Sequence, residues 1–163
     1  MAPRSEQLQI RVTPREKSAL KRRARAAGQD VSAYVLALAL PSESTRFASI
    51  IEALRDENNR RFALAELNGA LSALVPLEFA AAVDSIDVQG LDPIWQNYVA
   101  AMVEHAARAN GVQAPGWTRD VVPVDRPYFA TSLRSLRSYL LRVSPVAFKR
   151  RNIFVDATVG ARV

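Results

Sequence analysis

Few side chains in this sequence have the types and spacing that catalysis requires. The only histidine, His105, follows Glu104 in an apolar stretch, and the chain has no cysteine. A metal site would therefore rest on one imidazole plus carboxylates, without the two-histidine spacing of metalloproteases. Asp84 and Asp87 are better explained as loop residues than as a general acid and base. We therefore expect no enzyme, no metal and no cofactor, and interpret His105 as a partly buried structural residue near Trp117.

A different chemistry is suggested by the stretch EQLQIRVT, in which three polar side chains alternate with three apolar ones. This period of two predicts a β-strand with one buried and one open face. A lone strand leaves its backbone groups unpaired, so we expect it to pair antiparallel with the same strand of a second copy. On the open face of such a ribbon, Gln can bond adenine and Arg can bond guanine in the major groove. The expected base readers are Gln7, Gln9 and Arg11, and the expected dimer core is Leu8, Ile10, Val12, Tyr34, Val35 and Leu38.

Two helices are expected after the strand. Thr13 and Glu16 have the spacing of a capping box, and Gly28 suits the end of the first helix. Asp30 then caps VSAYVLALAL, and Pro41 ends it. This second helix is apolar almost all round, which predicts burial. A unit of about forty residues without disulfide or metal needs a second copy to bury such a helix.

Residues 6–41 resemble the ribbon-helix-helix family of DNA-binding proteins, which includes Arc, MetJ and many antitoxin-type repressors. The resemblance rests on the alternating strand, the Thr-Pro helix start, the Gly-Gln-Asp-Val-Ser turn and the apolar second helix. It implies that the three polar strand residues read bases and that backbone N–H groups near Val31 and Ser32 hold a phosphate. Asp30 stands where many members have Ser or Thr. Further phosphate contacts are expected from Arg4, Lys17, Lys21 and Arg22.

The rest of the chain predicts a mainly α fold, with a ribbon-helix-helix domain at 1–41 and a helical domain at 42–163. Helices are expected from Ser42 or Ser44 to Leu54, over 62–74, from Pro76, and from Asp92 to Gly111. RDENNRR is either exposed helix or a break between helices. SLRSLRSYLLRV is expected to form one helix, SPVAF a short one, and Ile153 to Val155 a β-like segment. The leucines expected to face inward are Leu133, Leu136, Leu140 and Leu141.

The net charge of +6 is unevenly distributed. It is +5 over 1–30 (eight Lys or Arg, three Asp or Glu), −5 over 31–124 (six and eleven) and +6 over 125–163 (eight and two). Basic segments favour a polyanionic or acidic partner. We expect Lys149, Arg150, Arg151 and Phe154 to form a partner-binding surface. The alternative is a solvated face on a packed final strand.

The C-terminal motifs VEHAAR, PGWT and SPVAFKRRNIFVD look like those of bacterial antitoxin-like regulators that lie beside nucleotidyltransferase-type toxins. Together with the N-terminal resemblance, this implies a homodimeric repressor that binds a double-stranded DNA operator. It would be the antitoxin of a type II toxin–antitoxin pair, with a cognate toxin bound to its C-terminal domain. Two alternatives are a stand-alone regulator that senses a small molecule and an architectural protein that binds DNA without sequence preference.

Targeting signals give one further expectation. The most apolar run, VSAYVLALALP, is shorter than the roughly 20 residues that span a bilayer, and the N-terminal residues lack a secretory pattern. We therefore expect a cytoplasmic protein without a membrane partner.

Overall fold

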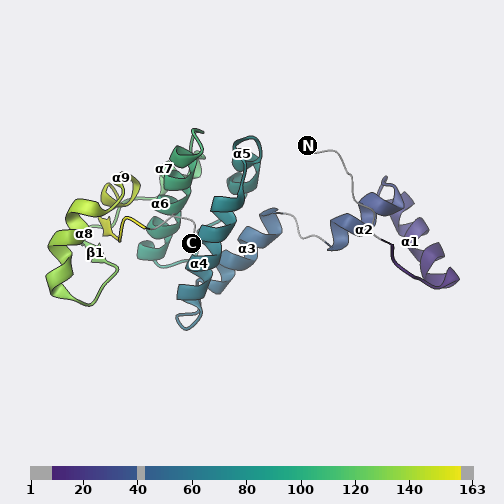
Figure 1. The fold of residues 1–163 in the computed structure, drawn as a ribbon, viewed down its shortest axis with the longest axis horizontal. Helices are drawn as coiled ribbons and strands as arrows, with labels where there is room; N and C mark the ends of the chain where they lie inside the picture. Colours follow the sequence, from purple (N-terminus) through teal and green to yellow (C-terminus); the bar gives the residue numbers. More distant parts are fainter. Residues whose placement is uncertain (1–8, 40–42, 159–163) are drawn as a thin grey trace. The chain divides into compact units, whose positions relative to one another are not determined.

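The chain divides into two compact units, Met1–Ser42 and Glu43–Val163, in a computed structural model that describes residues 9–39 and 43–158. Figure 1 traces both units in sequence colours. The predicted mainly α fold is confirmed, with a single pair of short strands among the described residues. No described helix is both long enough and apolar enough to cross a bilayer.

The N-terminal unit contains helices α1 (Pro14–Ala26) and α2 (Val31–Ala39), which pack against each other. Both helices lie where the sequence predicts them. The turn between them includes Gly28, whose φ of 66° lies in the left-handed region that glycine adopts without strain. Residues 9–13 have no regular secondary structure in the single chain, and the backbone of Thr13 is extended. The predicted strand needs a second copy for its partner, so ribbon pairing stays a prediction.

The C-terminal unit begins with α3 (Glu43–Ala53), α4 (Arg60–Ala73) and α5 (Pro76–Asp84). The RDENNRR stretch is a break: Asp56 accepts hydrogen bonds from the Asn58 backbone and the Asn59 side chain, forming a turn between α3 and α4. The longest helix, α6 (Pro93–Ala109), starts at Asp92, whose carboxylate accepts a hydrogen bond from Ile94 N at 2.9 Å.

Short elements complete the C-terminal unit. They are α7 (Trp117–Asp120), β1 (Tyr128–Phe129), a 3-10 turn η1 (Arg134–Leu136), α8 (Arg137–Val143), α9 (Val146–Lys149) and β2 (Ile153–Phe154). Strands β1 and β2 pair in parallel, with Tyr128 opposite Ile153. The proline-rich segment between α6 and η1 thus contributes the helical turn α7 and the strand β1.

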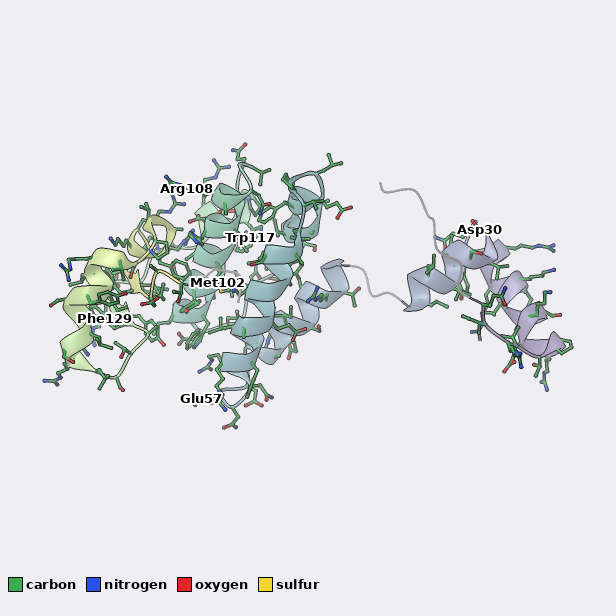
Figure 2. All side chains as sticks on the ribbon, in the orientation of Figure 1. Asp30, Glu57, Met102, Arg108, Trp117 and Phe129 are labelled. Carbon is green, nitrogen blue, oxygen red and sulfur yellow. The ribbon has the colours of Figure 1, made fainter. Side chains whose placement is uncertain are left out.

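The core of the C-terminal unit forms around α6. Figure 1 shows α6 between the helices α3–α5 on one side and the α8, α9 and β-strand group on the other. Met102, labelled in Figure 2, lies inside this core and is 4% exposed. Phe47, Phe79 and Phe148 are fully buried around it. Because α6 contacts elements from both sides, it joins the two halves of the unit.

The sequence predicts that four leucines of SLRSLRSYLLRV face inward, and this prediction is wrong for three of them. Leu140 is buried, but Leu133, Leu136 and Leu141 are 58%, 41% and 48% exposed. The segment is a 3-10 turn followed by a two-turn helix rather than one continuous helix. This change of helical type breaks the 3.6-residue register, so the leucines do not share one buried side.

Candidate nucleic-acid interface

A capping box fixes the direction in which the segment 9–13 enters α1. The Thr13 hydroxyl accepts a hydrogen bond from Glu16 N at 3.3 Å, and Thr13 N donates to Glu16 Oε2 at 2.8 Å. The hydrogen bond from the Thr13 backbone lowers the pKa of Glu16, which keeps this carboxylate charged beside the positive end of the helix. The cap therefore fixes the backbone at Thr13, two residues after Arg11.

Six cations cover α1, against the single acid Glu16. All six are exposed, and Lys17, Lys21 and Arg25 are spaced four residues apart on one face. Like charges at this spacing destabilise an isolated helix by roughly 0.2–0.5 kcal/mol per pair. A phosphate backbone would offset that repulsion and release counterions. The predicted phosphate contacts Lys17, Lys21 and Arg22 thus lie on an exposed, strongly basic helix.

The start of α2 was predicted to hold a phosphate near Val31 and Ser32. Asp30 occupies this helix end: its Oδ1 accepts a hydrogen bond from Ala33 N at 2.9 Å. Asp30 is labelled in Figure 2 beside the turn between α1 and α2. Its carboxylate satisfies one backbone donor that a phosphate would otherwise use, and it repels an anion. A phosphate at Val31 and Ser32 would therefore bind beside a fixed negative charge.

Most of the predicted base readers and dimer-core residues are exposed where the structure describes them. Gln9 and Arg11 are exposed, whereas Arg4, Gln7 and Leu8 lie outside the described residues. Three predicted core side chains, Ile10, Val12 and Leu38, are 61%, 42% and 64% exposed in the single chain. Tyr34 and Val35 are half-buried. This apolar surface is what a second copy would cover, and the dimer itself stays a prediction.

The predicted C-terminal partner surface is only partly available. Arg151 is 3% exposed and Phe154 is 8% exposed, so both are buried rather than presented to a partner. Phe154 stacks on Phe129 with ring centroids 4.9 Å apart. Lys149 donates from Nζ to Arg142 O at 2.7 Å, and Arg150 keeps an exposed guanidinium. The prediction that Arg151 belongs to a partner-binding surface is therefore wrong, because its side chain is buried inside the protein.

The buried Arg151 crosslinks three parts of the C-terminal unit. Its Nη2 donates to Glu104 Oε1 at 2.7 Å and to Thr118 O. Its Nη1 donates to Asn97 Oδ1 at 3.1 Å and to Val121 O at 3.2 Å. A buried guanidinium is tolerated because its charge is paired and both of its Nη atoms donate hydrogen bonds, while Nε has no partner among the described residues. This cluster holds α9 and β2 to α6 and α7, and its role is structural.

A sequence signal for this cluster was available but was missed. Asn97 and Glu104 are seven residues apart on α6, so they lie on the same helix face, and both belong to its buried side. Two polar residues on an otherwise apolar face require a buried partner. That partner is the third cation of the run Lys149 to Arg151.

An open groove of about 410 Å³ lies between the end of α6 and α9. Its lining combines small apolar residues with the cations Arg108 and Arg150 and the carboxylate of Glu104. Glu104 Oε2 is buried and has no hydrogen-bond partner among the described residues. The groove therefore brings two cations and one carboxylate together beside the end of α6.

His105 has no catalytic partners in the described structure. Its ring lies 6.5 Å from that of Phe148, while Trp117 donates from Nε1 to Val83 O at 3.0 Å. Burial, with a smaller contribution from the positive charge of Arg108, lowers the pKa of His105, so the imidazole is neutral at pH 7. No group of acidic or histidine side chains able to hold a metal occurs within 9–39 and 43–158.

Comparison with known proteins gives one match. Residues 2–74 match the model of a family described as NikA-like, mobilization protein NikA. No curated protein and no solved structure matched the chain. The matched residues include the N-terminal unit and continue through α3 and α4, and they make up less than half of the chain. Residues 2–74 are therefore similar to a family of DNA-binding proteins of the ribbon-helix-helix type.

Proposed function

We propose that this protein is a homodimeric, sequence-specific DNA-binding protein that acts in DNA mobilisation. The observation that carries the proposal is the match of residues 2–74 to the family described as mobilization protein NikA. The match covers the segment 9–13, α1 and α2 together, which are the elements that a ribbon-helix-helix dimer requires. The basic, exposed surface of α1 supports the same function.

In the proposed complex, two copies pair residues 6–13 across a two-fold axis and place the ribbon in the major groove. Gln7, Gln9 and Arg11 then face base edges twice, once from each copy. The cations of α1 contact phosphates on either side and provide affinity without sequence information. The two-fold symmetry of the protein requires inverted half-sites in the DNA.

The C-terminal unit serves, in this proposal, as the part that engages another protein on the DNA. It has its own hydrophobic core and an internal ion-pair cluster, so it can present a fixed surface. The N-terminal unit delivers that surface to a chosen DNA site. The protein performs no chemistry itself, and the reaction on the DNA belongs to the bound partner.

Antitoxin and repressor activity is the second candidate. The C-terminal motifs VEHAAR, PGWT and SPVAFKRRNIFVD favour it, because they resemble antitoxin-like regulators. In that case the C-terminal unit would neutralise a toxin, and DNA binding would repress transcription. Ligand sensing is a third candidate, supported by the groove between α6 and α9.

A gene deletion in the native host separates these functions. Mobilisation predicts that the transfer frequency of the replicon carrying the gene falls while growth is unchanged. Arg11→Ala, expressed from a second copy of the gene, should restore transfer less well than the wild-type chain does. Growth arrest on deletion, with rescue by the wild-type chain, would instead favour the antitoxin. Unchanged transfer together with normal growth would contradict both and favour the ligand-sensing regulator.

A further inference from the structure

Charge is segregated along the C-terminal unit. Residues 62–107 contain six Asp or Glu and no Lys or Arg, whereas residues 126–155 contain seven Lys or Arg and no Asp or Glu. Most of these charges are exposed, the main exceptions being Glu104 and Arg151, which neutralise each other inside the protein. The unit therefore has an acidic portion and a basic portion.

Each portion also exposes large apolar side chains. We define the acidic face as Val75, Leu77, Glu78 and Asp84, at and along α5. Leu77 is 86% exposed, Val75 is 50% exposed, and Leu77 and Asp84 are two helical turns apart on one side of α5. An exposed leucine beside carboxylates is suited to an apolar, basic surface.

The basic face has the complementary composition. We define it by the exposed residues Leu133, Arg134, Leu136, Leu141 and Arg142 of η1 and α8. Within the described residues, neither Arg134 nor Arg142 has a carboxylate within ion-pair distance. Exposed leucine and arginine side chains without an ion-pair partner are available to a second molecule, although Tyr139 of α8 also holds one carboxylate, that of Asp156.

The two faces cannot contact each other within one unit. Figure 1 shows α5 and α8 on opposite sides of α6. The main contacts of α5 are with α3, with a further hydrogen bond from Trp117 of α7 to Val83 O, and the main contacts of α8 are with η1 and β2. Pairing like faces of two copies would bring equal charges together, which is unfavourable. Complementary charges meet only when the basic face of one copy contacts the acidic face of another.

We propose that C-terminal units of neighbouring copies associate head to tail through these two faces. Such a heterologous contact leaves one face of each terminal copy free, so it can add successive copies to a chain. Copies bound at adjacent DNA sites would support one another, and occupancy would become cooperative. This inference goes beyond DNA recognition by the N-terminal unit, and it holds whether the chain acts in mobilisation or in repression.

Two charge-reversed variants of the full chain test the contact. Arg134→Glu with Arg142→Glu reverses the basic face, and Glu78→Lys with Asp84→Lys reverses the acidic face. Sedimentation velocity of the wild-type chain should reveal species larger than the dimer at about 0.05 M salt that diminish at about 1 M salt. Either variant alone should weaken this association at least about tenfold.

Mixing the two variants gives the decisive result. Each variant retains one native face, so an equimolar mixture should restore species larger than either variant forms alone. Circular dichroism should be unchanged, because all four substituted side chains are exposed. A wild-type chain that stays dimeric at every concentration and salt would overturn the proposal and leave an acidic partner protein as the occupant of the basic face. Loss of DNA affinity in the Arg134 and Arg142 variant, with association unchanged, would overturn it in favour of a nucleic-acid contact.

Discussion

Arg151 Nη2 donates to Glu104 Oε1 at 2.7 Å, and both side chains are about 95% buried, at 4% and 5% exposure. Removing Arg151 leaves Glu104 with the exposed Arg150 as its remaining ion-pair partner, and it also leaves the acceptors Asn97 Oδ1, Thr118 O and Val121 O without their donor. Arg151→Met should therefore lower the free energy of unfolding by about 3–5 kcal/mol. Chemical denaturation of the full chain, followed by far-ultraviolet circular dichroism, measures this loss.

Arg150 provides the matched control for that experiment. It contacts the same Glu104 oxygen, but its side chain is 56% exposed. Water replaces a surface ion pair at little cost, so Arg150→Met should change stability by no more than about 1 kcal/mol. Equal losses for the two variants would show that burial of Arg151 does not determine the stability of this cluster.

Base reading by the ribbon predicts that Arg11→Ala changes sequence preference. Loss of a bidentate contact to guanine should cost about 1–3 kcal/mol on the preferred site and relax selection at one base of each half-site. Binding to a panel of single-base variants of the site, in fluorescence anisotropy titrations, measures this directly. An equal loss on preferred and random DNA would mean that Arg11 contacts phosphate.

Lys21→Ala should behave differently, because Lys21 lies on α1 among other cations rather than on the ribbon. Affinity should fall by a similar factor on every sequence, and the slope of log affinity against log salt should decrease by about one. The same titrations at several salt concentrations provide the measurement. A loss of affinity that depends on the DNA sequence would show that Lys21 contacts base edges rather than phosphates.

Asp30 should limit DNA affinity. Its carboxylate accepts a hydrogen bond from Ala33 N, where a phosphate would approach the start of α2. Asp30→Asn keeps an acceptor for the cap but removes the charge, so DNA should bind more tightly by up to about tenfold. Asp87→Asn is the matched control, because Asp87 is a carboxylate of the C-terminal unit that also accepts a backbone hydrogen bond, from Gln89 N at 2.8 Å. Weaker DNA binding by the Asp30 variant would show that the carboxylate helps to form the interface.

The stability of the C-terminal unit should depend on the charge of His105. Burial lowers its pKa in the folded state, so the unfolded chain takes up the proton first as pH falls. The folded state consequently loses stability as pH drops below about 6.5, the pKa of an unperturbed histidine. His105→Gln should remove this loss. A stability difference between the two proteins that is independent of pH would contradict the lowered pKa.

The N-terminal helices could be predicted because their signals are local. The cap at Thr13, the glycine at position 28 and the acid at position 30 each act within one turn of the backbone. The long helix α6 was predictable for the same reason, since Asp92 caps it and its apolar side chains repeat with the helical period.

The C-terminal basic segment was harder to predict because its structure depends on distant partners. The sequence alone presents Lys149, Arg150 and Arg151 as equivalent cations. Only tertiary packing brings Arg151 to Glu104, which lies 47 residues earlier in the chain, and leaves Arg150 at the surface. The burial of the leucines of η1 and α8 was predicted wrongly for a related reason. The prediction assumed one continuous α-helix, whereas a 3-10 turn at the start of the segment changes which side chains share a face.

The central claim is that the exposed ribbon segment of a dimer reads DNA sequence, and selection from a random DNA library tests it most directly. The full chain should enrich an inverted repeat and bind it at least about 10³-fold more tightly than a shuffled duplex at about 0.15 M salt. Equal affinity for the two duplexes, with the same dependence on salt, would contradict the claim. It would show that the N-terminal unit binds DNA through its positive charge alone, without sequence preference.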